Sequence, residues 1–298
     1  MKFYLASIDW NKYRDRMVKL QLIQRSTWNN QHQIVNVLCS EIGEIDIADI
    51  RKSQIELYIG KRLHTCAPVT VAGEINVLRQ ILNWCVDEQH LAVRPRLPSV
   101  SVPNVEMDLP PDEAYTFVLK NIPDQHAASL EFMLLTGLSP HELERIQHRD
   151  YRIRMADDAV ECPLEVQIGM RADFQTKTPA RKRTIMLNKR ASTILLQMTL
   201  GMPDTGLAFP SRESTEKAIQ RMRKRHPDAP AGVERITPKM MRQWFASKIS
   251  GDVAENVLQA LLGHAPGSSV TRRHYVRSNE AQRVDAVSNL SISAKDPI

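Results

Sequence analysis

The chain has 298 residues, of which 42% are hydrophobic and 25% are charged. It is too apolar for a disordered protein and long enough for two domains, each with its own core. Its 40 basic residues exceed its 34 acidic ones, giving a net charge of +6, a moderate excess that suits a polyanionic partner. No stretch has the roughly 18 apolar residues of a membrane span, and no signal-peptide pattern opens the sequence. We therefore expect a cytoplasmic protein with no membrane partner.

The cysteines and histidines show no spacing typical of a metal site. The four cysteines are far apart and form no CxxC pair, which indicates small core residues of a reduced protein. His141 and Glu142 begin the pattern of a zinc protease, but Arg145 stands where that motif needs its second histidine. We expect no metal and no cofactor. Acidic residues form no ordered trio either, which disfavours carboxylate-based transposases and nucleases.

A proline-rich segment divides the chain. From residue 93 to residue 111 the sequence is VRPRLPSVSVPNVEMDLPP, and its five prolines remove backbone donors and favour extended conformations. We place one domain at residues 1–98, the linker at 99–111 and a second domain at 112–298.

The first domain has the apolar spacing of helices. Residues 70–90 carry apolar side chains at alternating intervals of four and three, from Val71 to Cys85, which predicts one buried helix face. Less regular helical patterns cover Trp28–Ile42 and Ile50–Leu63. We expect a small all-helical domain whose exposed lysines and arginines face a partner.

The second domain mixes helices and strands. Helical patterns cover Asp112–Lys120 and Asp124–Leu135, and they return from Lys189 to about Leu290. Short alternating segments between them predict an antiparallel sheet. The expected strands are Tyr151–Met155, Leu164–Ile168, Ala172–Thr176 and Arg183–Leu187. The whole chain is therefore mostly α, of the α+β class, with one small sheet.

Basic residues gather around a predicted turn between two strands. The stretch QTKTPARKRTIML contains Lys177, Arg181, Lys182 and Arg183. One interpretation is a hairpin tip whose charges only improve solubility. The other is a hairpin that enters a DNA groove and delivers one lysine to a phosphate.

Two helix ends carry further cations. Arg221 and Arg223 lie in IQRMRKRHP, where cations at a helix C-terminus are favoured by the helix dipole and also suit phosphate contacts. In ITPKMMRQWFASKIS, a helix is expected to begin at Pro238. Lys239 and Arg242 then share one face of its first turn, either as a phosphate clamp or as a solvated turn.

One tyrosine lies in an unusually basic context. The stretch LLGHAPGSSVTRRHYVR places Tyr275 after Arg272 and Arg273, eleven residues beyond His264. A phenol has a pKa of about 10, so it is a nucleophile only where positive charge stabilises the phenolate. The alternative is an ordinary amphipathic tyrosine at a helix end.

The order of these motifs resembles the tyrosine recombinases of the phage integrase family. A lysine on a β-turn, Lys-x-x-Arg at a helix start, LLGH and the late tyrosine follow each other as in their catalytic domain, and TGLSPHEL resembles their TGLR-x-x-E-L motif. TVAGEINVLRQILNWCVDEQHLAVRPRLP resembles the last helix and exit linker of their core-binding domain. The resemblance covers about residues 28–280. It implies a C-shaped clamp of two domains around double-stranded DNA.

The resemblance also implies roles for individual residues. Tyr275 matches the nucleophile that forms a 3′-phosphotyrosine, and Arg242 matches an arginine that binds the non-bridging phosphate oxygens. Lys177 matches the general acid for the leaving 5′-oxygen, and His264 matches a histidine that hydrogen-bonds the phosphate. Glu142 matches the acidic residue that supports the first catalytic arginine.

The sequence departs from this pattern at three places. Ser139 stands where the first catalytic arginine is expected, and losing that charge costs about 2 to 4 kcal/mol of transition-state stabilisation. Three explanations stand: an arginine from elsewhere fills the gap, the chain has lost catalysis but binds DNA, or the serine was introduced to stall a complex. Lys239 replaces the usual histidine, as in type IB topoisomerases. Pro266 and Gly267 look like an insertion before the tyrosine.

We expect a site-specific DNA recombinase that cuts and rejoins DNA as a homo-oligomer, a tetramer on paired sites. The tail from Asn279 to Ile298 is expected to dock on a neighbouring protomer. The alternative is a catalytically impaired relative that binds DNA and shapes an assembly.

Overall fold

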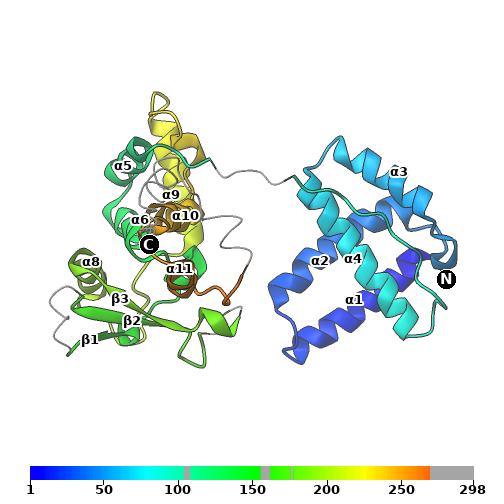
Figure 1. Ribbon diagram of the computed structural model, residues 1–298, viewed down its shortest axis with the longest axis horizontal. Helices are drawn as coiled ribbons and strands as arrows, with labels where there is room; N and C mark the ends of the chain where they lie inside the picture. Colours follow the sequence, from blue (N-terminus) through cyan, green and yellow to red (C-terminus); the bar gives the residue numbers. More distant parts are fainter. Residues whose placement is uncertain (104–107, 156–161, 175, 177, 269–298) are drawn as a thin grey trace, which may run out of the picture. The chain divides into compact units, whose positions relative to one another are not determined.

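The computed structural model describes residues 1–103, 108–155, 162–174, 176 and 178–268. Contacts divide the chain into two units, Met1–Val105 and Glu106–Ile298, which Figure 1 shows and which we describe one at a time. No helix in the described ranges is long and apolar enough to cross a membrane.

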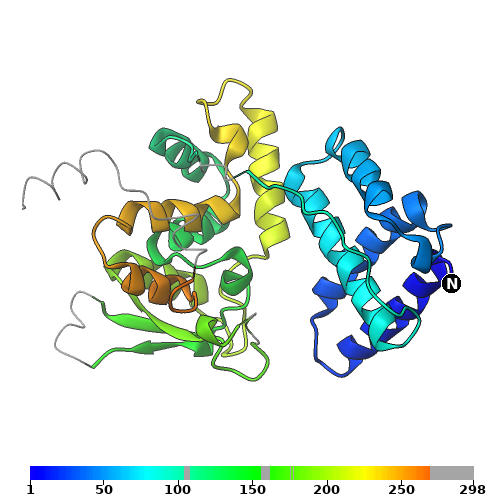
Figure 2. The same cartoon turned by 45° about the vertical axis from the view of Figure 1, so that its right-hand side comes forward.

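The N-terminal unit is helical. Its helices are α1 (Phe3–Lys19), α2 (Arg25–Ile42), the short 3-10 helix η1 (Ile47–Asp49), α3 (Lys52–Leu63) and α4 (Pro68–Asp87). The helix α4 contacts α1, α2 and α3, because its apolar stripe lies at the centre of the core (Figures 1 and 2). The predicted helices at residues 28–42, 50–63 and 70–90 are confirmed to within a few residues.

The first helix was not predicted from the sequence. Phe3, Ala6 and Trp10 of α1 are buried, at the three- and four-residue spacing of one helix face. Exposed apolar residues such as Leu5 and Ile8 lie between them and obscure the periodicity.

The second unit surrounds one larger core. Its helices are α5 (Asp112–Asn121), α6 (Asp124–Thr136), α7 (Pro140–Leu143), η2 (His148–Asp150), η4 (Pro179–Arg181), α8 (Lys189–Thr199), α9 (Arg212–Arg225), η5 (Val233–Arg235), α10 (Pro238–Ile249) and α11 (Glu255–Leu262). The apolar helix α6 is central, since it contacts α5, α7, α8, α10 and the sheet (Figure 1). Its burial agrees with the densely apolar sequence of Asp124–Leu135.

The sheet has three antiparallel strands in the order β1 (Tyr151–Ile153), β2 (Leu164–Ile168) and β3 (Arg183–Leu187). Leu164 pairs with Leu187, and Ile168 pairs with Arg183. Alternate side chains of β2 and β3 are buried, as half-buried strands require. The mostly helical class with one small sheet is therefore confirmed.

The predicted strand at Ala172–Thr176 is wrong. In the described part of this segment the chain forms a turn, in which the backbone N–H of Phe174 donates to the carbonyl of Arg171 at 3.1 Å. Arg171 in turn donates to Asp150 Oδ1 at 2.7 Å and to the carbonyl of Arg145 at 2.9 Å. The alternation came from Phe174, which packs into the core from a turn held by Arg171.

Candidate active site

The turn that follows α6 forms the first wall of the site. Gly137 has a φ of 66°, and a Cβ atom there would lie 2.4 Å from the ring of Phe245. Both the left-handed conformation and the packing therefore require glycine. The carbonyl of Gly137 accepts a 2.9 Å hydrogen bond from Arg242 Nη1, which ties this turn to α10.

Ser139 caps the N-terminus of α7 and holds Glu142. Both the backbone N–H and the Oγ of Ser139 donate hydrogen bonds of 2.9 Å to Glu142 Oε2. The Oγ also accepts from the backbone N–H of Glu142 at 3.4 Å, which completes a reciprocal capping box. Only 2% of Glu142 is exposed. The serine at the expected arginine position therefore orients this carboxylate but brings no charge.

Three arginines surround the Glu142 carboxylate. Arg183 donates from Nη1 to Oε1 at 2.9 Å and from Nη2 to Oε2 at 3.4 Å. Arg242 Nη1 donates to Oε2 at 3.5 Å, and Arg181 Nη1 lies 3.8 Å from Oε1. Burial acts to raise the pKa of Glu142, but the charge and hydrogen bonds of Arg183, followed by the charge of Arg242, lower it to about 2. Glu142 is thus ionised at neutral pH.

The strand β3 delivers Arg183 to the interior. Arg183, Ile185 and Leu187 share the buried face of this strand, because every second residue points the same way. Arg183 Nε donates to the carbonyl of Leu261 at 2.9 Å, and Nη1 donates to the carbonyl of Arg181 at 3.0 Å. The sequence grouped Arg183 with an exposed basic turn, whereas the structure makes it the main partner of a buried carboxylate.

The helix α10 contributes Arg242. The helix begins at Pro238 as predicted, although the Thr237 side chain forms no capping hydrogen bond within the described residues. Only 4% of Arg242 is exposed. Its Nη2 donates to the carbonyl of Leu262 and lies 3.1 Å from Nε2 of His264. Because a guanidinium can only donate, His264 Nε2 accepts, and its Nδ1 carries the ring proton.

Steric constraints explain why Gly263 of the Gly-His pair is a glycine. Gly263 follows the last residue of α11 with a φ of 64°. A Cβ atom there would lie 2.7 Å from Arg183 Nη1 and 3.0 Å from Arg181 Cα. Glycine therefore lets the end of α11 pack directly on the arginines, and the next residue, His264, enters the same cluster.

His264 is neutral at pH 7. Burial, followed by the charges of Arg242 and Arg181, lowers its pKa to about 4. A neutral imidazole adds no further positive charge to the cluster.

The loop after His264 folds back on α11. The backbone N–H of Gly267 donates to Gln259 Oε1 at 3.0 Å, and Gln259 Nε2 donates to Glu255 Oε1 at 2.9 Å. This hydrogen bond holds Gly267, one of the two residues that the sequence suggested as an insertion, beside α11.

Four described residues that were predicted for the site lie outside this cluster, and one of them, Arg223, is internal. Lys182, Lys239 and Arg221 are exposed, and no hydrogen bond or ion pair links their side chains to another described residue. Lys239 begins the same helix as Arg242, but the two differ sharply in burial. Four other predicted residues, Lys177, Arg272, Arg273 and Tyr275, lie outside the described residues.

Arg223 connects two parts of the backbone. Its Nε donates to the carbonyl of Val233 at 3.0 Å, and its Nη2 donates to the carbonyl of Ile236. These bonds tie α9 to the segment that leads into α10. The structure thus gives Arg223 an internal role, beside the phosphate contact expected from the sequence.

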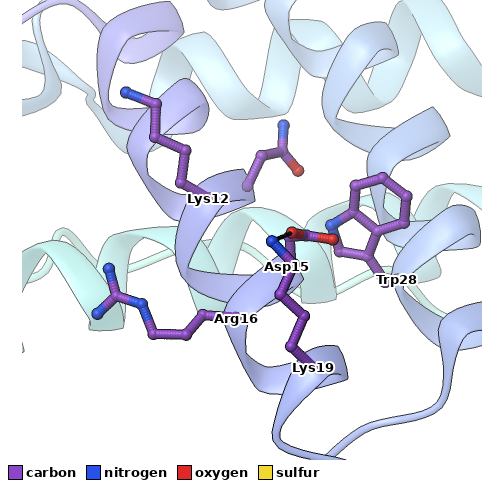
Figure 3. A pocket seen from close by; sticks show the side chains of 6 residues that line it. Lys12, Asp15, Arg16, Lys19 and Trp28 are labelled. Carbon is purple, nitrogen blue, oxygen red and sulfur yellow. Dashed lines mark ion pairs between the residues drawn. The ribbon is translucent and has the colours of Figure 1, made fainter.

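The N-terminal unit has a cationic hollow of its own. Lys12, Arg16 and Lys19 of α1 line a hollow of about 440 Å³ together with Asp15 and Trp28 (Figure 3). Asp15 pairs with Lys19 at 2.9 Å, while Arg16 extends away from this pair in Figure 3. Lys12 pairs with Asp9, one turn earlier in α1, at 3.0 Å. The exposed cations expected in the first domain therefore include a row along α1.

The cluster in the second unit is suited to an anion. Among the described residues it holds three guanidinium groups, one carboxylate and one neutral imidazole, so positive charge is in excess. A low dielectric strengthens the attraction for an incoming anion. No group of His, Cys, Asp or Glu side chains within the described ranges is arranged to hold a metal ion.

Comparison with known families identifies the chain. A model of the phage integrase family matches residues 113–282, more than half of the sequence. The chain belongs to the phage integrase family. This phage integrase is thus a site-specific DNA recombinase of the tyrosine type, as its motifs predicted. No curated protein sequence matches it.

Solved integrases share the fold of this family member. It is similar to the Tn1549 transposon integrase in complex with a circular intermediate DNA, with 15% identity, a TM-score of 0.71, and coverage of 97% of this chain and 100% of the other. It is also similar to a lambda integrase dimer bound to a core site, with 14% identity, a TM-score of 0.66, and coverage of 94% and 98%. A lambda integrase tetramer bound to a Holliday junction matches with 16% identity, a TM-score of 0.63, and coverage of 90% and 78%.

Proposed function

We propose that the chain cuts and rejoins double-stranded DNA through a covalent bond between Tyr275 and a 3′-phosphate. The phenolic oxygen loses its proton to solvent and attacks the phosphorus, and the bond to the 5′-oxygen breaks as that oxygen takes up a proton. The 5′-hydroxyl of a partner strand reverses the step and releases the tyrosine. The phosphodiester energy is retained in the protein linkage, so the exchange needs no high-energy cofactor.

The observation that carries this proposal is the excess of guanidinium groups around Glu142. Negative charge grows on the non-bridging oxygens in the transition state, and fixed cations in a buried site stabilise it. Arg242 is the closest match to a phosphate-binding arginine, and neutral His264 offers Nδ1–H to the same group. Glu142 holds the arginines in place.

Further residues complete the reaction. Lys177 protonates the leaving 5′-oxygen as general acid. The exposed Lys239 contacts a flanking phosphate or the reacting one once DNA is bound. Arg181, Lys182, Arg221, Arg272 and Arg273 are assigned to the DNA backbone.

The N-terminal unit is assigned to DNA binding as a core-binding domain at residues 1–98. The cations along α1 support this assignment, because Lys and Arg side chains at one surface position a protein on the phosphate backbone. Residues 99–111 link it to the catalytic domain, and we propose that the two close around DNA as a clamp. The reaction takes place in the cytoplasm.

We propose a homotetramer on paired sites. Two strand exchanges require a second copy of the site, and the lambda integrase structures include a dimer on a core site and a tetramer on a junction. The residues after Asn279 would dock on a neighbour. A strictly 1:1 complex on DNA with two sites would contradict this.

A nicked suicide substrate tests the chemistry. The substrate carries the site that the protein selects from a pool of random duplexes. The nick lets the short fragment with the released 5′-hydroxyl diffuse away, so the covalent intermediate cannot be reversed. We expect a covalent protein–DNA adduct that is absent with Tyr275→Phe. Tight binding without an adduct would instead favour an assembly protein that has lost catalysis.

A further inference from the structure

Position 139 carries a serine where the family has an arginine, so the positive charge of that arginine must come from another residue. The N–H and the Oγ of Ser139 both donate hydrogen bonds to Glu142, and Ser139 brings no positive charge. Yet three guanidinium groups lie within 4 Å of that carboxylate. Two of them are close in sequence, because Arg181 ends η4 and Arg183 begins β3.

Arg183 occupies the place of a carboxylate-bound arginine. It forms a two-pronged pair with both oxygens of Glu142, which is the geometry that a guanidinium forms best. Its Nε and Nη1 also donate to the carbonyls of Leu261 and Arg181. Since only 9% of Arg183 is exposed, its charge is fixed and shielded from solvent.

Arg181 is placed differently. Its side chain is 26% exposed, and its guanidinium makes no hydrogen bond to another described residue. Its backbone is held on three sides: the N–H donates to the carbonyl of Thr178 at 3.1 Å, the carbonyl accepts from Arg183, and Cα lies against Gly263. Because its backbone is fixed and its guanidinium is accessible, Arg181 is suited to bind an anion.

We propose that Arg181 and Arg183 together replace the arginine that position 139 lacks. The buried Arg183 positions Glu142. The more exposed Arg181 donates to a non-bridging oxygen of the reacting phosphate, beside Arg242. The inference rests on the proposed function for its substrate, but the charge arrangement can be tested without the reaction. It answers the question that the sequence left open in favour of an arginine from elsewhere in the chain.

Binding of inorganic phosphate tests the anion site without DNA. We expect phosphate, compared with chloride at equal ionic strength, to raise the melting temperature of the wild-type protein and to lose most of this effect in Arg181→Ala. Arg190→Ala is the matched control, because Arg190 pairs with Glu131 at 2.7 Å on the exposed surface of the same unit. Equal protection of wild type and Arg181→Ala would overturn the proposal.

Adduct formation on the suicide substrate tests the catalytic part. We expect Arg181→Ala to slow cleavage by about 100-fold, the usual effect of losing one oxyanion donor, while Arg190→Ala cleaves at the wild-type rate. Wild-type cleavage by Arg181→Ala would refute this role. If the wild type itself forms no adduct while phosphate protection still depends on Arg181, the anion site stands and the recombinase proposal fails.

A rescue variant tests replacement directly. Arg183→Met leaves Glu142 without its main partner, and we expect loss of cleavage with a lower melting temperature. Adding Ser139→Arg to Arg183→Met returns a guanidinium next to Glu142, and we expect at least tenfold recovery of cleavage relative to Arg183→Met. If melting temperature recovers without cleavage, Arg183 serves stability alone and the proposal is wrong.

Discussion

Arg183 and Glu142 are 41 positions apart in the sequence, yet Arg183 Nη1 donates a 2.9 Å hydrogen bond to Glu142 Oε1 in a buried part of the protein. This pair joins β3 to α7. It places the permanent charge of one arginine against a carboxylate that Ser139 orients from the other side. Because the charges of this pair cancel, the surplus of positive charge in the site comes from Arg181 and Arg242.

Stability should fall in acid because of Glu142. Its folded pKa of about 2 lies below its usual value of 4.5, so the ionised form contributes stability that is complete above pH 4.5. That contribution, about 3 kcal/mol, is lost as the pH falls toward 2. Urea unfolding between pH 3 and pH 6 should show this slope, and Glu142→Gln should be less stable at pH 6 and lack most of the slope. An unchanged slope in Glu142→Gln would contradict the prediction.

His264 should remain neutral across the physiological range. Its folded pKa of about 4 lies below the usual 6.5, so the unfolded chain takes up a proton first as the pH falls. The stability associated with the neutral ring is complete above pH 6.5 and is lost as the pH falls from 6.5 to 4. Imidazole ¹⁵N NMR should show Nδ1–H with an acceptor Nε2 at pH 6. Half-protonation near pH 6.5 in the free protein would refute this.

Gly263→Ala should impair the site more than its backbone cost explains. The left-handed conformation costs a non-glycine residue about 1 kcal/mol, and the added Cβ also meets Arg183 and Arg181. Gly201→Ala is the control, because Gly201 has a φ of 73° and no described atom within 4 Å of its Cβ position. We expect similar strain in both variants but slower adduct formation only in Gly263→Ala. Equal cleavage rates would show that the close approach is unimportant.

Arg221 and Arg223 should separate DNA binding from stability. Arg223→Ala removes two charged hydrogen bonds to carbonyls and should lower the free energy of unfolding by about 3 kcal/mol. Arg221→Ala should leave unfolding unchanged and reduce the salt dependence of DNA binding by about one counterion. Denaturant unfolding and binding titrations at several salt concentrations measure both. A stable Arg223→Ala protein with weaker binding would reverse the assignment.

Most helices could be predicted because their apolar spacing is local. The stripe from Val71 to Cys85 and the apolar run of Asp124–Leu135 both became buried helices. The spacing failed at α1, where exposed apolar residues are interleaved with buried ones, and at Ala172–Thr176, where a turn buries Phe174. In both cases the contacts that decide the structure are made by residues distant in sequence.

The sequence by itself determined the family, the class of fold and the identity of four residues that meet in the site: Ser139, Glu142, Arg242 and His264. Each of these residues belongs to a short motif, and such a motif can be recognised without knowing how the chain packs. Only the tertiary structure decided which cation faces Glu142. The sequence grouped Arg183 with an exposed basic turn, whereas the structure places it with Ile185 and Leu187 on the buried face of β3 and gives it a partner on another element. Long-range pairing depends on how β3, α10 and α11 pack around the turn after α6, and no interval in the sequence encodes that distance.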